Sequence, residues 1–171
     1  RWVDLTNKSV EFILTDHAYC EQKATTNCIS IIQGYPEYEN VVDAIVPIVT
    51  EEWGHFKLVL EKLKERNLKL GPQRRDEYVN KLLKFMGSGG NRDQQLVERL
   101  LVAAMIEARS CERFRLLSQS ILEDDLKLFY KNLMISEAGH FRLFLDLASS
   151  ILPKETVMER WEEYLVFEAE M

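Results

Sequence analysis

The sequence is poor in the residues that interrupt helices, with only 7 Gly and 4 Pro among 171 residues. These few breakers gather in short clusters, such as QGYPEYEN at 33–40 and MGSGGNRD at 86–93, with long uninterrupted stretches between them. This spacing of helix-breaking residues is typical of a helical protein. Because 46% of the residues are hydrophobic, the chain can bury a core, and we expect 1–171 to form a single domain.

Cysteine is scarce as well. The three cysteines, Cys20, Cys28 and Cys111, are odd in number, lie inside helical patterns and form no Cys-x-x-Cys pair. This pattern argues against a disulfide framework, and we interpret the three side chains as reduced thiols of the core in a reducing compartment.

Long apolar runs and excess positive charge are also lacking. No apolar run reaches the roughly 18 residues that a membrane-spanning helix needs, and RWVDLTNKSV at 1–10 does not resemble a signal peptide. We therefore expect a soluble, cytoplasmic protein that does not bind membranes. The net charge of -6 disfavours an overall nucleic-acid-binding surface but is compatible with a local basic patch.

What the sequence does contain is helical periodicity. Apolar residues at three- and four-residue steps predict four long helices at 6–33, 38–66, 92–121 and 125–149, and two shorter ones at 73–85 and 154–168. The inner face of the first helix is apolar or small except for Glu21, and that of the third is similar except for Glu107. A single carboxylate on such a face requires a partner.

A short motif supplies those partners, because EEWGH at 51–55 and SEAGH at 136–140 both read Glu-x-x-His. The two copies lie 85 residues apart, and Glu21 and Glu107 lie 86 apart. This spacing predicts two duplicated helical hairpins, each with a Glu on its first helix and Glu-x-x-His on its second. Glu112, in the segment EARSCERF, is the competing candidate on the third helix, but it fits the offset less well and has polar helical neighbours.

The predicted ligand set is typical of one class of metal site. Glu and His at i and i+3 lie on one helix face, close enough to bind one metal ion together. Four carboxylates and two imidazoles form the dinuclear sites of helical bundles, and their charge balances two divalent ions. Oxygen and nitrogen ligands favour iron or manganese over a thiolate zinc site. The predicted ligands are Glu21, Glu52, His55, Glu107, Glu137 and His140, with His17 as a neighbour of the site.

Four segments together resemble the MiaE-type tRNA hydroxylases: DHAYCEQKA (16–24), EEWGHF (51–56), IEARSCERF (106–114) and SEAGHF (136–141). The resemblance implies an all-α, ferritin-like four-helix bundle with a non-haem diiron centre. It also implies a monooxygenase that uses dioxygen and an external electron donor to hydroxylate the prenyl group of 2-methylthio-isopentenyl-adenosine beside the anticodon. Its substrate partner would be tRNA.

A local basic stretch agrees with such a partner. Residues 57–84 contain nine Lys or Arg against four acidic residues, within a chain of net charge -6. Lysine and arginine position a nucleic-acid backbone through its phosphates. The candidate contacts are Lys62, Lys64, Arg66, Arg74 and Arg75.

Other functions use the same ligand pattern. A ferroxidase or iron-storage subunit is the first alternative, although it would assemble into a shell, whereas we expect a monomer or small homo-oligomer. Another ferritin-like diiron hydroxylase is the second, including a membrane-facing ubiquinone-pathway enzyme. A metal-free helical interaction module would bind no iron at all.

Overall fold

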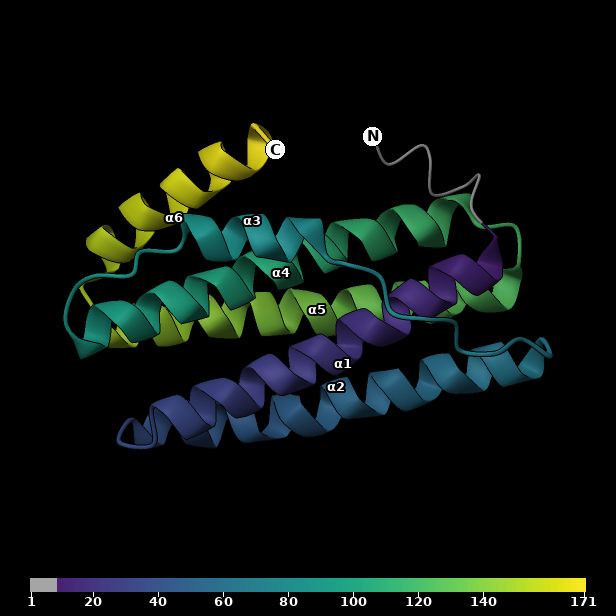
Figure 1. Cartoon of the computed structure of the whole chain (residues 1–171), viewed down its shortest axis with the longest axis horizontal. Helices are drawn as coiled ribbons and strands as arrows, with labels where there is room; N and C mark the ends of the chain where they lie inside the picture. Colours follow the sequence, from purple (N-terminus) through teal and green to yellow (C-terminus); the bar gives the residue numbers. More distant parts are fainter. Residues whose placement is uncertain (1–8) are drawn as a thin grey trace. The chain divides into compact units, whose positions relative to one another are not determined.

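The computed structural model describes residues 9–171, and within this range it contains six helices and no strand (Figure 1). The helices are α1 (Val10–Gly34), α2 (Glu39–Glu65), α3 (Glu77–Phe85), α4 (Arg92–Ser120), α5 (Asp124–Ile151) and α6 (Lys154–Ala169). The predicted start of the first helix at residue 6 lies outside the described residues. All the other predicted helices are present, with small differences at their ends.

The helix predicted at 73–85 begins four residues later than expected. It starts at Glu77 because the side chain of Asp76 accepts a hydrogen bond from the backbone N–H of Val79 (3.1 Å) and so caps the first turn. The residues before it are extended. Pro72 and Gly71 disfavour helix there, which the charge pattern of the stretch did not reveal.

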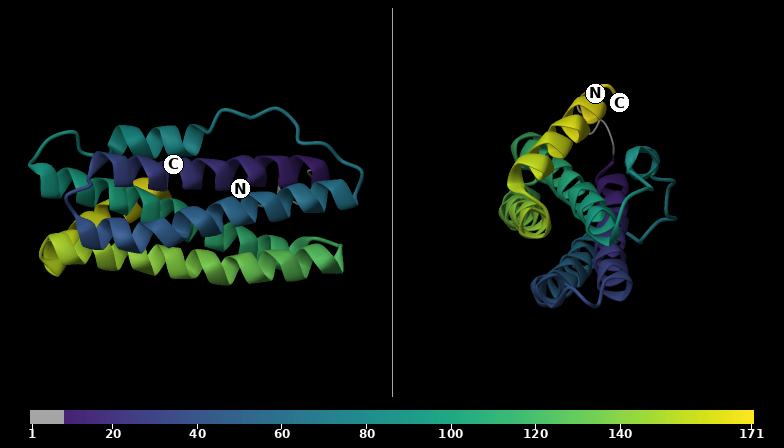
Figure 2. Two further views of the ribbon diagram at one scale, coloured as in Figure 1. Left: turned by 90° about the horizontal axis from the view of Figure 1, so that it is seen from below. Right: turned by 90° about the vertical axis from the view of Figure 1, so that its left-hand side faces the viewer.

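The first hairpin consists of α1 and α2, which run side by side in opposite directions (Figures 1 and 2). Ser9 caps α1 by accepting a hydrogen bond from the backbone N–H of Phe12 (3.3 Å). Pro36 lies in the four-residue turn at 35–38 and prevents α1 from continuing. The turn of the second hairpin, between α4 and α5, lies at 121–123. The two turns contain the midpoints between Glu21 and Glu52 and between Glu107 and Glu137, as expected for residues that lie level on antiparallel helices.

By its internal contacts the chain forms two compact units. The first comprises residues up to Arg75 together with Arg113–Met134, and the second comprises Asp76–Glu112 and Ile135–Met171. Helices α4 and α5 therefore each contribute residues to both units. Because the units are interleaved in the sequence, neither is a consecutive segment, and the single domain 1–171 stays a prediction.

The first unit has a continuous apolar core. Its members come from α1, α2 and the parts of α4 and α5 that flank their turn. They are Ile13, Leu14, Ala18, Phe56, Val59, Leu63, Phe114, Leu117, Leu126, Tyr130 and Leu133. Burial of side chains of this size contributes about 1.5–3 kcal/mol each to folding, so this core fixes the helices that carry the site.

An extended strap, residues 67–75, connects α2 to α3 and runs back along α1 (Figure 2). It begins at Asn67, whose φ of 55° ends α2 in a left-handed conformation. Gly71 attaches the strap to α1, because its carbonyl accepts a hydrogen bond from the hydroxyl of Tyr19 (2.9 Å) and its N–H donates to Thr15 Oγ1 (3.3 Å). The guanidinium of Arg74 lies 3.7 Å from the centre of the Phe12 ring.

The second unit is organised around the carboxylate of Glu98 on α4. It accepts hydrogen bonds from Arg160 Nε (2.6 Å), the Tyr164 hydroxyl (2.8 Å) and the backbone N–H of Gly87 (2.8 Å). Burial by itself would raise the pKa of Glu98, but the hydrogen bonds from Arg160, Gly87 and Tyr164 outweigh it and hold this pKa below its usual value.

We expect Glu98→Gln to lower the free energy of unfolding by about 2 kcal/mol at pH 7, because charge-assisted hydrogen bonds to Arg160 are lost. A lowered folded-state pKa stabilises the protein above the unfolded-state pKa, and this contribution disappears as pH falls through the folded value. The difference between variant and parent in urea denaturation is therefore expected to shrink below about pH 4. Glu163→Gln is the control, since Glu163 pairs with the same arginine but its side chain is 60% exposed. If Glu98→Gln lowered the free energy of unfolding equally at pH 7 and below about pH 4, this account would be contradicted.

Candidate metal centre

In the first unit, three of the predicted ligands come together. Glu21 extends from α1, and Glu52 and His55 lie one turn apart on α2. His55 Nδ1 lies 3.6 Å from Glu21 Oε2 and 3.9 Å from Glu52 Oε2, and one ligand atom from each residue falls within 4.8 Å of the others. The two carboxylates are buried, with Glu52 fully inaccessible and Glu21 3% exposed. We call this set the α1–α2 half-site.

His17 lies one turn before Glu21 and is also completely buried. Its Nε2 is 2.5 Å from Glu21 Oε1, and its ring packs against Phe114 (4.6 Å between ring centres) and Tyr130 (5.5 Å). Burial lowers the pKa of His17, despite the opposing effect of the Glu21 carboxylate. Because a carboxylate oxygen only accepts hydrogen bonds, His17 Nε2 is the donor in its contact with Glu21. His17 supports a predicted ligand, as the sequence indicated.

In the second unit, Glu107 of α4 meets Glu137 and His140 of α5. All three are buried, with exposures of 4%, 1% and 5%, and their ligand atoms lie within 4.8 Å of one another. We call this set the α4–α5 half-site. It has the same composition as the α1–α2 half-site: one Glu from the first helix of a hairpin and Glu-x-x-His from the second.

The competing candidate, Glu112, does not share this environment. Its side chain is 41% exposed and pairs with Arg109, which also pairs with Glu168 of α6 (3.0 Å). The step of five positions from Glu107 to Glu112 turns the helix by about 500°, or roughly 140° beyond a full turn. Of the two, only Glu107 therefore lies on the same face as the buried core.

The donor set of each half-site suits iron. In each half-site the ligand atoms of two buried carboxylates and one imidazole lie within 4.8 Å of one another. Without a cation, these buried carboxylates would repel each other and would lose their hydration. Oxygen and nitrogen donors of this kind favour iron or manganese. No cysteine belongs to either group, so a thiolate site is not indicated for the described residues.

One interaction close to the α1–α2 half-site was not predicted from the sequence. Arg113 NH2 forms an ion pair with Asp16 of α1 (2.7 Å), and Arg113 NH1 lies 3.9 Å from Cys20 Sγ. These residues belong to DHAYCEQKA and IEARSCERF, so two of the segments that carry the resemblance contact each other. Burial raises the pKa of Cys20 to about 11, which keeps its thiol protonated. None of the three cysteines is in a disulfide.

The five candidate tRNA contacts differ in their surroundings. Arg66 forms ion pairs with Glu123 (2.6 Å) and Asp125 (2.7 Å), and Lys62 pairs with Glu65 (2.8 Å) and Asp125 (3.4 Å). Their positive charges are therefore largely offset by neighbouring carboxylates. Lys64, Arg74 and Arg75 are exposed. Two of the acidic partners, Glu123 in the turn before α5 and Asp125 in the first turn of α5, were not recognisable from the composition of 57–84 alone.

Within residues 9–171, none of the helices combines the length and apolar character that a transmembrane span requires.

Comparison with known proteins gives consistent matches. The family model described as tRNA-(MS2IO6A)-hydroxylase (MiaE) matches residues 1–171. The tRNA 2-(methylsulfanyl)-N(6)-isopentenyladenosine(37) hydroxylase of Pseudomonas putida is 34% identical over 147 residues, covering 86% of this chain and 70% of that protein. The hydroxylase of the same name from Salmonella typhimurium is 35% identical over 116 residues, covering 68% of this chain but only 42% of that protein.

A solved structure from Synechococcus, titled "Protein 43 with aldehyde deformylating oxygenase activity", is similar at a TM-score of 0.92 and 33% identity. The likeness covers 99% of this chain and 83% of that one. Together with the all-helical content of residues 9–171, it confirms the predicted all-α, ferritin-like fold.

Proposed function

Because this chain belongs to the MiaE family of tRNA hydroxylases, we propose that it hydroxylates the prenyl group of 2-methylthio-isopentenyl-adenosine beside the anticodon of tRNA. The relatives from Pseudomonas putida and Salmonella typhimurium carry the name of this activity. On this proposal the protein is a diiron monooxygenase that acts on tRNA in the cytoplasm. Iron storage, the alternative, is not favoured by these relatives.

The observation that carries the proposal is the repeated half-site. Each half-site contains two buried carboxylates and one imidazole within 4.8 Å, and a Glu from one helix with Glu-x-x-His from the next is the ligand composition of dinuclear carboxylate proteins. The proposed iron ligands are Glu21, Glu52, His55, Glu107, Glu137 and His140. Two iron ions held there would supply the activation of dioxygen. One oxygen atom enters a C–H bond of the prenyl group, and the other leaves as water with two electrons and two protons from an external donor.

The chain's own residues orient and shield this centre. The Nε2–H of His17 holds one oxygen of Glu21, which fixes the carboxylate's rotation and leaves Glu21 Oε2 toward His55. The rings of Phe114 and Tyr130 pack on His17 and are nearly inaccessible to solvent. They exclude water from this side of the α1–α2 half-site, which limits unproductive loss of the oxidant.

The direct test is a reaction of the iron-loaded protein with tRNA that carries the prenyl modification, a chemical reductant and dioxygen. After digestion to nucleosides, we expect a prenyl adenosine heavier by one oxygen atom. Labelled dioxygen is expected to transfer its label, whereas tRNA without the prenyl group and a reaction without dioxygen serve as controls. Failure to form the product with an iron-replete protein would refute the proposed function.

The exposed basic residues of 57–84 are proposed to contact the tRNA backbone. We expect the double variant Lys64→Glu/Arg75→Glu to weaken tRNA binding by about tenfold or more at moderate salt. It is also expected to flatten the salt dependence by about one to two log units per log unit of salt, because up to two phosphate contacts are lost. These two residues are preferred to Arg74, whose replacement also removes its contact with Phe12.

The matched control is Lys131→Glu/Lys154→Glu, which makes the same charge change at two exposed lysines outside 57–84. Filter binding or fluorescence titration across a salt series gives both quantities. If both double variants weaken binding equally, the effect is one of overall charge, and 57–84 is not the contact surface.

A further inference from the structure

Two neighbouring contacts join the first half of α1 to the last part of α4, and both lie within the first unit. The guanidinium of Arg113 forms an ion pair with Asp16 (2.7 Å). The ring of Phe114 packs against that of His17, with 4.6 Å between the ring centres. Consecutive residues of α4 therefore contact consecutive residues of α1, which fixes the position of this part of α1 along α4.

The ion pair is better shielded from water than a typical surface pair. The side chain of Arg113 is 12% exposed and that of Asp16 is 35% exposed. Arg113 NH1 also lies 3.9 Å from the Sγ of Cys20, one turn after Asp16 on α1. Removal of one partner from a largely buried pair costs more than removal from an exposed one, because the remaining charge loses its compensation. The pair is therefore suited to hold α1 in place.

His17 connects this attachment to the proposed metal centre. It follows Asp16 directly in the sequence, and its Nε2 lies 2.5 Å from Glu21 Oε1. The other carboxylate oxygen, Glu21 Oε2, lies 3.6 Å from Nδ1 of His55. A displacement of the segment that carries His17 would therefore move the hydrogen bond that sets the rotation of the Glu21 carboxylate.

We propose that Arg113 is a positioning residue of the metal centre, which acts through Asp16 and His17 on the carboxylate of Glu21. The inference rests on the proposed iron ligands and adds a residue that is not itself a ligand. Loss of a group that orients a metal ligand typically lowers metal affinity or activity by about 10–100-fold. We expect an effect of about tenfold for Arg113, because it acts through intervening residues.

The test measures the affinity for ferrous iron under argon, by competition with a chelator. Arg113→Gln is expected to weaken iron binding about tenfold, and Asp16→Asn is expected to have a similar effect. The double variant is expected to bind iron no more weakly than either single variant, since both changes remove the same ion pair. Arg113→Lys keeps the charge and is expected to restore most of the affinity. If Arg113→Gln does not fold, Asp16→Asn and Arg113→Lys still decide the question.

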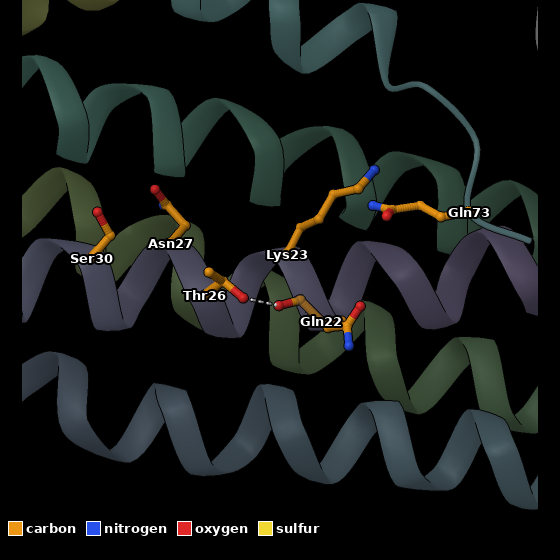
Figure 3. A pocket seen from close by; sticks show the side chains of 6 residues that line it. All are labelled: Gln22, Lys23, Thr26, Asn27, Ser30 and Gln73. Atoms are coloured by element: carbon orange, nitrogen blue, oxygen red, sulfur yellow. Dashed lines mark hydrogen bonds between the residues drawn. The ribbon is translucent and has the colours of Figure 1, made fainter.

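Two controls separate positioning from a general loss of stability. Glu98→Gln removes a charge-assisted contact with Arg160 in the second unit, so it is expected to destabilise the protein without changing the affinity for iron. Asn27→Ala changes a partly exposed polar residue about three turns after Asp16 on the same side of α1. Asn27 lines a polar groove there (Figure 3), and its replacement is also expected to leave iron binding unchanged.

Steady-state kinetics with prenylated tRNA provide a second measurement. At saturating iron, Arg113→Gln is expected to lower kcat severalfold and to leave KM close to that of the parent, because the substrate surface is unchanged. A higher KM with unchanged kcat and iron affinity would show that Arg113 contacts the substrate instead, and this would overturn the proposal.

The iron affinities decide the proposal independently of activity. It is overturned if Arg113→Gln and Asp16→Asn bind iron as tightly as the parent, or if both controls weaken iron binding as much as these variants do. If the parent binds iron but does not hydroxylate prenylated tRNA, the proposed function fails while the comparison of affinities still tests Arg113. If the parent binds no iron, the proposed ligands are wrong and the role of Arg113 fails with them.

Discussion

Replacing Glu107 with Ala is expected to remove at least half of the iron that the parent binds and to abolish hydroxylation of tRNA. Glu107 is one of two buried carboxylates in the α4–α5 half-site. Its loss removes one of the three ligands that define this half-site, and dinuclear carboxylate sites use a carboxylate at this position. His140→Ala is expected to have the same effect. Iron is measured per chain by a chelator assay or by atomic emission, after reconstitution with ferrous iron under argon.

Glu112→Ala is the matched control, since it changes a glutamate five residues away on the same helix. Its side chain is partly exposed and paired with Arg109, so we expect iron content and activity close to those of the parent. Circular dichroism of both variants verifies that the helices persist. If Glu112→Ala lost iron and Glu107→Ala retained it, the iron ligand contributed by α4 would be Glu112 and not Glu107.

Removal of iron is expected to lower the melting temperature by roughly 5–15 °C. At a metal concentration 100 to 1,000 times the Kd, binding to the folded state alone adds about 3–4 kcal/mol to the free energy of unfolding. For a chain of this size each kcal/mol corresponds to about 2–4 °C. A second contribution acts in the same direction, because the metal-free protein keeps four carboxylates buried in two groups without cations to offset their repulsion.

Calorimetry of the metal-free protein, with and without ferrous iron under argon, measures this shift. Glu107→Ala is the control, because the same addition of iron is expected to raise its melting temperature much less. Zinc or calcium in place of iron distinguishes a specific effect from general binding of divalent cations. A metal-free protein as stable as the iron-loaded parent would contradict the proposed role of the carboxylates.

The sequence by itself determined the helices and the composition of both half-sites. Glu-x-x-His places two side chains on one helix face through the helical period alone, and the nearly constant offset between the two copies, 85 and 86 residues, assigned a partner to each. The solitary Glu21 and Glu107 were recognisable because a carboxylate on an apolar stripe is costly unless it has a partner. Such signals depend on residues within a few turns of one another, which periodicity describes well.

Only the tertiary structure decided how distant residues affect one another. The charges of Lys62 and Arg66 are offset by Glu123 and Asp125, about sixty residues further along the chain. The pairing of Arg113 with Asp16 joins residues 97 positions apart, and the hydrogen bond of Gly71 with Tyr19 on α1 joins residues 52 positions apart. A local count of charges shows neither, because an ion pair depends on side-chain positions that the packing of the core sets.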